Sequence, residues 1–222
     1  MSFLPSEKMG QIVAIYFPGP AKKNSLYCRR LIVLKDTSNI LRIQERIALG
    51  DQSAYKELFE LFYHRLLRLA FIITKSRELS EEIVSDVFIG IWRKREKISS
   101  IENLPVYLYV AIKNTSLNYL SRLTKATIMS LDDLDFEPEQ PFADPEQALI
   151  TREMNNRIYR AIQSLPPRCR IIFKLVKEDG LTYREAAEVL HLSVGTIDNQ
   201  LVLALKKLSH ALFYSFKKEK KY

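Results

Sequence analysis

The sequence has few of the residues that build disulfide frameworks, metal sites or catalytic centres. Its 222 residues include two cysteines and three histidines. Cys28 and Cys169 belong to no CxxC pattern, and the histidines stand at no ligand spacing, so we expect neither a disulfide nor a zinc site. No nucleophile with its base and no pair of catalytic carboxylates stands out. We therefore predict that the protein is not an enzyme and has no cofactor, no metal and no small-molecule substrate.

Long apolar runs are also missing. No run approaches the roughly twenty residues of a membrane-spanning helix. The apolar stretch at residues 12–17 is too short for the core of a secretory signal. We therefore expect a cytoplasmic protein.

Glycine is scarce, with six residues, and strand-like alternation is confined to the N-terminal part of the chain. Apolar residues at helical spacing fill most of 40–120 and 147–214. The sequence predicts an all-α protein in which two small helical domains, 45–120 and 147–214, are joined by a flexible linker at 121–146. Residues 1–44 form an N-terminal extension of unknown role, either disordered or upstream of the true start, and residues 215–222 form a basic tail.

Charge is distributed unevenly along the chain. The net charge of +8 divides into +5 for 1–44, +1 for 45–120, −5 for 121–146 and +7 for 147–222. The acidic stretch contains Pro138, Pro141 and Pro145, which do not fit a helix interior, so it is interpreted as a linker that lets the two domains change their spacing. The basic C-terminal part fits a phosphate-binding surface, although a solvated, soluble face is the plain alternative.

Residues 181–208 have the pattern of a helix-turn-helix. Thr182 and Glu185 form a capping box that begins the first helix, which should end near Leu190. Ser193 is a second N-cap candidate. His191 occupies the turn, where glycine is common, and we expect it to adopt a left-handed conformation. An ordinary helical hairpin is the alternative on pattern alone.

The second of these helices has two distinct faces. Its apolar stripe is predicted to face the protein and consists of Val194, Ile197, Leu201, Leu205 and Leu208. The opposite face carries hydrogen-bonding groups that could read base edges or bind phosphates, namely Thr196, Asp198, Asn199, Gln200 and Lys206.

The first domain contains three helical segments. Residues 54–73 have a broad apolar face. Ser80 is the expected N-cap of the next helix, with Glu81 and Glu82 in its first turn. A third helix begins near Pro105 and mixes tyrosines, amides and cations, which suits unpaired bases, although the tyrosines could equally complete a helical core.

Three motifs, SEEIVSDVFIGIWRKREKI, NLPVYLYVAIKNTSLNYLSRL and the helix-turn-helix with its preceding SLPPRCRIIFKLVKEDG, together resemble regions 2 and 4 of the sigma-70 family. Their order, their spacing and the acidic linker agree with the extracytoplasmic-function subgroup. The resemblance covers roughly residues 45–214 and implies a promoter-specificity factor that binds core RNA polymerase through its β and β′ subunits and also binds promoter DNA. It also implies an anti-sigma factor, often anchored in a membrane, as a further partner.

The resemblance assigns roles to particular positions of this sequence. The residues implied to bind polymerase are Glu82, Asp86, Trp92 and Arg93. Those implied to open and hold the −10 element are Tyr107, Tyr109, Asn114, Asn118 and Arg122. Those implied to contact the −35 element are Tyr183, Arg184, Val194, Gly195, Thr196, Asp198, Asn199, Gln200, Lys206 and Lys207. A helix-turn-helix regulator that binds DNA alone, with 45–120 as a dimerisation or effector domain, is the competing hypothesis.

Overall fold

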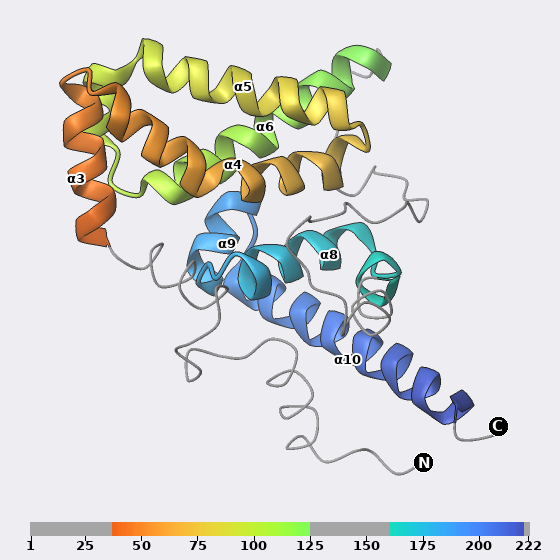
Figure 1. The fold of residues 1–222 in the computed structure, drawn as a ribbon. Coiled ribbons are helices and arrows are strands. Elements are labelled where there is room, and N and C mark those ends of the chain that lie inside the picture. The colour runs from red at the N-terminus through yellow and green to blue at the C-terminus, as the bar shows by residue number, and fades with distance from the viewer. Residues whose placement is uncertain (1–36, 125–159, 220–222) are drawn as a thin grey trace.

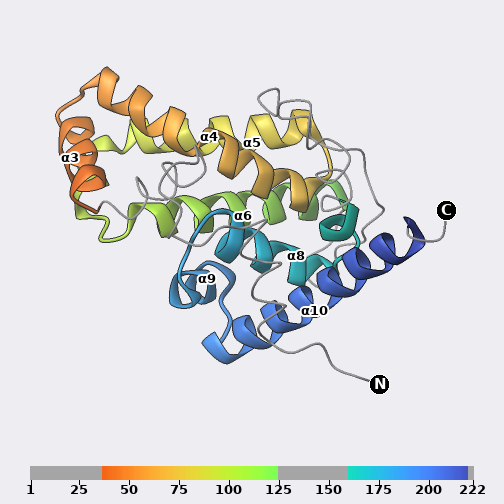
Figure 2. The same cartoon turned by 60° about the horizontal axis from the view of Figure 1, so that its bottom comes forward.

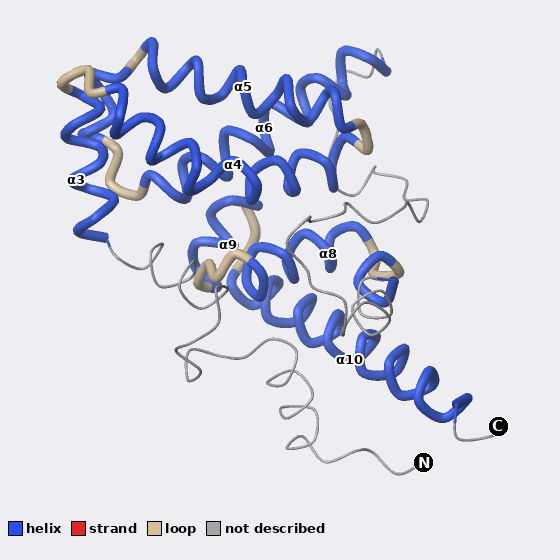
Figure 3. Tube along the Cα trace, in the orientation of Figure 1, coloured by secondary structure: helices blue, strands red, loops and turns tan. Residues whose placement is uncertain are grey.

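The computed structural model describes residues 37–124 and 160–219, with side chains to residue 210. Within these ranges every regular element is a helix, as Figure 3 shows, and the all-α prediction is confirmed. None of the described helices is long and apolar enough to cross a membrane. The predicted extension up to residue 36 and residues 125–146 of the predicted linker lie outside the described residues, whereas residues 121–124 of that linker form the end of α6.

The first block, residues 37–124, is a bundle around the long helix α4. Its elements are α3 (Thr37–Ala48), α4 (Gln52–Thr74), α5 (Arg77–Arg93), the 3-10 helix η1 (Arg95–Ser100) and α6 (Leu104–Thr124). Helix α4 packs against α5 and α6, and α3 packs against η1. Leu58, Phe62 and Phe88 lie in the core and are almost completely buried.

This block begins at Thr37, earlier than the predicted boundary at residue 45. Ile40 and Ile43 of α3 are buried in the core. Gln44 is also buried, and its Nε2 donates to the carbonyl oxygens of Ile98 at 2.8 Å and Ile101 at 2.9 Å. These buried residues and the two hydrogen bonds hold α3 against η1. Helix α3 therefore belongs to the first block.

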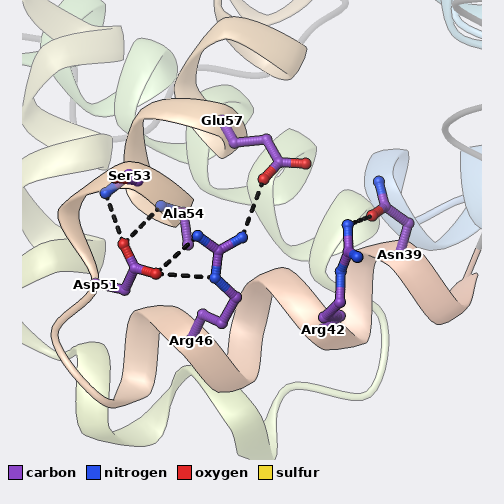
Figure 4. Close-up of polar contacts among 7 residues, drawn as sticks. All are labelled: Asn39, Arg42, Arg46, Asp51, Ser53, Ala54 and Glu57. Carbon is purple, nitrogen blue, oxygen red and sulfur yellow. Dashed lines mark hydrogen bonds and ion pairs between the residues drawn. The ribbon is translucent and has the colours of Figure 1, made fainter.

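The turn between α3 and α4 is organised by one carboxylate (Figure 4). Asp51 is the N-cap of α4, and its Oδ1 accepts from the backbone amides of Ser53 and Ala54. Its Oδ2 accepts from Arg46, which also reaches Glu57. Hydrogen bonding by the Ala54 amide and by Arg46 lowers the pKa of Asp51. The carboxylate thus joins two helices while satisfying the free amides of the second.

Helix α5 begins one turn before the expected N-cap. Ser76 is its N-cap, and the Ser76 Oγ accepts from the Leu79 amide. Ser80 lies inside the helix, where its hydroxyl donates to the Ser76 carbonyl oxygen and lies 2.8 Å from Thr74 Oγ1. The prediction that Ser80 begins the helix was wrong, because the Ser76 hydroxyl caps the first turn and the Ser80 hydroxyl bonds back to a carbonyl of the preceding turn.

The second block, residues 160–219, contains the predicted helix-turn-helix. Helix α8 (Pro167–Phe173) continues into the π-helical turn η4 (Lys174–Glu178), which is followed by α9 (Tyr183–Leu190) and α10 (Val194–Glu219). The capping box between Thr182 and Glu185 is present, as expected. His191 has φ 54° and ψ 47°, so the predicted left-handed turn is also confirmed.

Helix α10 buries most of its predicted apolar stripe. Ile197, Leu201 and Leu208 are buried, whereas Val194 is 44% exposed. The inclusion of Val194 in the buried stripe was wrong, and Leu205 is partly buried against the core. The helix continues to Glu219, so residues 215–219 of the predicted tail are part of it.

The two blocks contact each other directly. Helix α9 lies against α6, and α8 lies near α4, as Figures 1 and 2 show from two directions. The charge pattern of the linker predicted two units with adjustable spacing, and it gave no sign of this contact.

Candidate DNA-binding and partner-binding surfaces

The predicted DNA-contacting residues of the helix-turn-helix are all exposed or partly exposed. The exposed members are Arg184, Val194, Gly195, Asp198, Asn199, Lys206 and Lys207, and the partly exposed members are Tyr183, Thr196 and Gln200. The structure therefore brings all ten predicted −35 residues to the surface of α9 and α10. Amides, a hydroxyl and cations on an exposed helix can contact base edges and phosphates.

The start of α10 is held by side-chain hydrogen bonds. Ser193 Oγ accepts from the Thr196 amide at 3.0 Å, as expected for an N-cap, and lies 2.8 Å from the Thr196 hydroxyl. This pair fixes the first turn of the helix, where Val194 and Gly195 are exposed. These hydrogen bonds therefore also fix the position of the next turn, which carries Asn199 and Gln200.

The Gln200 side chain is hydrogen-bonded to a cysteine that the sequence analysis had not linked to it. The Cys169 Sγ lies 2.9 Å from the Gln200 Oε1 and donates to it. Cys169 is buried, and burial raises the pKa of its thiol, so the sulfur keeps the proton that it donates. With its oxygen occupied in this way, Gln200 has its amide N–H groups available for other contacts.

Four of the five predicted −10 residues share a face of α6. Tyr107, Asn114, Asn118 and Arg122 are exposed and recur at intervals of seven, four and four residues, which places them on one side of a helix. An aromatic ring, two amides and a guanidinium on one exposed stripe can stack on and hydrogen-bond to unpaired bases. Tyr109 is not brought to this face, since it is fully buried.

The predicted polymerase-binding residues lie on α5. Glu82, Asp86 and Arg93 are exposed, and Ile89, between them on the same face, is 46% exposed. An exposed apolar residue can pack against another protein while the charges around it pair with charges of that partner. Trp92 is half-buried, and its ring centre lies 5.0 Å from that of Tyr55 on α4. It therefore packs α5 against α4 beside this exposed face.

The sequence analysis missed one residue that organises this surface. The Tyr119 hydroxyl lies 2.7 Å from Asp86 Oδ2 and 3.2 Å from Glu82 Oε1. Its hydrogen bond to Asp86 raises the pKa of Tyr119 to about 12. Tyr119 therefore holds both carboxylates of α5 from α6, the helix that also carries the −10 residues. No local pattern could show this, because the partners are far apart in the sequence.

Comparison with known protein families gives two matches, one in each block of the chain. The model of sigma-70 region 2 matches residues 58–126, and that of sigma-70, region 4 matches residues 155–208, together more than half of the chain. The first match covers α5 and α6, and the second covers the helix-turn-helix.

Curated relatives match over most of their length. The chain is 25% identical over 173 residues to the ECF RNA polymerase sigma-E factor of Escherichia coli (strain K12), covering 75% of this chain and 90% of that protein. It is 25% identical over 178 residues to the RNA polymerase sigma-H factor of Pseudomonas aeruginosa, covering 77% of this chain and 92% of that protein.

A solved structure shares the fold. CnrH, solved in complex with the cytosolic domain of CnrY, superposes with a TM-score of 0.51 at 21% identity, covering 81% of this chain and 99% of that chain. At this level of identity the likeness concerns the fold alone.

Proposed function

As a member of the sigma-70 family, in its extracytoplasmic-function group, this chain is a promoter-recognising sigma factor, and we propose a division of labour among its three exposed surfaces. The observation that carries the proposal is the presence of separate exposed faces on α5, α6 and α10, within or beside the matched regions. The chain binds core RNA polymerase, directs it to promoters and assists strand opening. It carries out no bond chemistry of its own.

The −35 element is contacted by the helix-turn-helix. Helix α10 enters the major groove, where Asn199 and Gln200 reach base edges. Arg184, Lys206 and Lys207, all exposed, contact phosphates. Few cations line the recognition helix, and part of the affinity comes from the other surfaces of the polymerase-bound protein.

The −10 element is contacted by α6. Tyr107 stacks on an unpaired base, and Asn114, Asn118 and Arg122 follow the same strand along the helix. The exposed face of α5, with Glu82, Asp86, Ile89 and Arg93, binds the β′ subunit of polymerase. The domain limits are 37–124 for the polymerase and −10 functions and 147–219 for the −35 function, of which 147–159 and the linker before them lie outside the described residues.

A protein that works on polymerase and promoter DNA acts in the cytoplasm, and we place this chain there. An anti-sigma factor, possibly anchored in a membrane, is its proposed regulatory partner. The fold neighbour CnrH was solved with the cytosolic domain of another protein, which supports a protein partner of this kind.

Reconstituted transcription tests the function. Purified chain and core polymerase are incubated with genomic fragments, and the 5′ ends of the transcripts are mapped. We expect discrete start sites that core polymerase alone does not give. A chain that binds DNA but neither co-purifies with polymerase subunits nor supports initiation would be the stand-alone regulator instead.

Paired variants test the division of labour. Asn199→Ala should alter the choice among mapped promoters, with about 1–3 kcal/mol lost at the base that it reads, while polymerase binding is unchanged. Asp86→Lys should weaken polymerase binding. Glu60→Lys makes the same charge change at an exposed position of α4 and serves as its control. If Asn199→Ala weakens polymerase binding instead, the recognition helix is misassigned.

A further inference from the structure

The side chain of Gln200 connects the recognition helix α10 to helix α8. Gln200 lies at the edge of the buried face of α10, next to Leu201 and three positions after Ile197, both of which are buried. It is itself partly exposed, and its Oε1 accepts from the Cys169 Sγ of α8 at 2.9 Å. Helices α8 and α10 pack against each other, so this hydrogen bond crosses their interface. One end of the Gln200 amide is therefore engaged inside the protein.

The chemistry of the two groups determines which end of the amide faces the cysteine. A thiol can donate its proton to an oxygen, whereas the NH2 group of a glutamine only donates. Cys169 is shielded from water, and burial raises the pKa of its thiol, so the sulfur keeps its proton. The oxygen of Gln200 therefore faces α8, and its NH2 group lies on the other side of the amide.

The position of Cys169 is fixed by hydrogen bonds of its neighbour in α8. Arg170 is buried, and its guanidinium donates to the Gln163 side chain at 2.7 Å and to the Leu165 carbonyl oxygen at 3.2 Å. These bonds tie α8 to the segment that precedes it. The start of α10 is held by its own N-cap, so both partners of the hydrogen bond stand on fixed helices. Such support gives a side chain the fixed orientation that base discrimination requires.

A glutamine that presents only donors matches a different base from a glutamine whose amide is free at both ends. The free side chain binds adenine in a bidentate manner, accepting from N6 and donating to N7. Guanine offers two neighbouring acceptors at the same edge, N7 and O6, and no donor. With its oxygen turned to Cys169, Gln200 can only donate toward the major groove. It therefore matches guanine, whereas the N6 donor of adenine finds no acceptor.

We propose that Cys169 is a positioning residue that sets the base preference of the recognition helix. By holding the oxygen of Gln200, it makes Gln200 a donor-only side chain that selects a G·C pair over an A·T pair at one position of the −35 element. The proposal rests on the proposed function, because it assigns Gln200 to a base edge. Cys169 acts through Gln200 and has no contact with DNA of its own, since it is buried.

Substitutions of Cys169 separate the hydrogen bond from the packing. Cys169→Ala and Cys169→Val both remove the donor, but alanine leaves a small cavity and valine fills the space. An effect that the two variants share is therefore due to the lost donor. Cys169→Ser keeps a donor in a side chain of similar shape, and it should retain the parental base preference.

Asn103→Asp provides a control, because it removes a different hydrogen bond that holds the helix-turn-helix. Asn103 Nδ2 donates to Glu185 Oε1 of α9 at 3.1 Å, and Asn103 Oδ1 accepts from the Val106 amide at the start of α6. Glu185 Oε2 also accepts from the Thr182 amide in the capping box. Aspartate still caps α6 but cannot donate to Glu185. This variant should leave the base preference unchanged, whatever its effect on the yield of transcripts.

Transcription from a set of promoter variants measures the base preference. The full chain and core polymerase are incubated with fragments of a mapped promoter in which each −35 position carries every base in turn, and the transcripts are counted by sequencing. The position that Gln200 reads is the one at which Gln200→Ala removes the preference. There the parent and Cys169→Ser should favour G·C over A·T by about tenfold. Cys169→Ala and Cys169→Val should lose this preference or shift it to A·T.

The hydrogen bond itself can be measured without polymerase or DNA. The chain has two cysteines, so in the full chain with Cys28→Ser the S–H stretching band of the infrared spectrum comes from Cys169 alone. This band should move toward the frequency of a free thiol in Gln200→Ala. An unmoved band, or a parental base preference in both Cys169→Ala and Cys169→Val, would overturn the proposal.

Failure of the proposed function has a different signature. The thiol band would still move in Gln200→Ala, but this variant would change the preference at no −35 position. That result would refute the assignment of Gln200 to a base edge, and the role of Cys169 in base preference with it, while leaving the hydrogen bond in place. If Gln200→Ala does remove a preference and the Cys169 variants do not, only the role of Cys169 is refuted.

Discussion

His191→Gly should stabilise the protein. His191 ends α9 with φ 54° and ψ 47°, a left-handed conformation that a residue with a β-carbon adopts at a cost of roughly 1–2 kcal/mol. Histidine is among the residues that tolerate this region, which favours the lower figure. Its side chain is exposed, so little packing is lost on its removal.

Glycine relieves the backbone strain. It also increases the conformational entropy of the unfolded chain, which lowers the free energy of unfolding by about 0.4–1 kcal/mol. The relief is the larger of the two, and the net gain should be about 0.5 kcal/mol, or roughly 1–2 °C in Tm for a chain of this size. His191→Val should instead lose about 1–2 kcal/mol, since a β-branched residue fits this conformation poorly.

Urea unfolding followed by circular dichroism gives the order of the three side chains. Lys75, with φ 60° at the end of α4, provides a matched series in the first block and should give the same order of glycine, parent residue and valine. A loss of stability in His191→Gly alongside a gain in Lys75→Gly would show that the histidine ring makes a stabilising contact, and the strain argument would fail at this turn.

Three further perturbations test other parts of the structure. Gln44→Leu removes both hydrogen bonds from α3 to η1, although the Ile98 carbonyl oxygen keeps its bond from the Ile101 amide, and should lower the free energy of unfolding by about 1–3 kcal/mol. The exposed Arg42→Ala should change it little; equal effects would contradict the burial of α3. Tyr119 should titrate near pH 12, seen as the difference in ultraviolet absorbance between the parent and Tyr119→Phe, and Asp86→Asn should lower that value; an ordinary Tyr119 pKa would refute the link between α5 and α6. The pKa of Asp51 is lower in the folded state, so its carboxylate stabilises the fold above its unfolded pKa of about 3.9 and loses this effect as the pH falls through the folded pKa. The difference in Tm between the parent and Asp51→Ala should therefore shrink in acid. A difference that stays constant with pH would exclude a charge effect.

Features determined by neighbours in the sequence could be predicted. The capping box at Thr182 and Glu185, the end of α9 and the left-handed His191 all depend on residues within one or two helical turns. The exposed face of α10 follows from helical spacing in the same way. The roles of Asn199 and Gln200 stay predictions, since exposure alone does not determine which base a side chain reads.

Features determined by distant residues could not. Tyr119 gives no sign of its contact with α5. Tyr109 stands two positions after the exposed Tyr107, yet it is buried against a turn some seventy positions later in the chain. Each of these requires tertiary packing, which periodicity along one helix does not encode.

The two tasks of Glu185 limit how freely the halves of this protein can be exchanged with those of its relatives. A transplanted C-terminal half carries its own capping box, so its helix-turn-helix should fold in any host. The bond from Asn103 comes from the other half, and a chimaera with a different residue at that position would keep its DNA-reading unit while losing one attachment between the halves. Chimaeras built from such halves should therefore take residues 103 and 185 from the same parent.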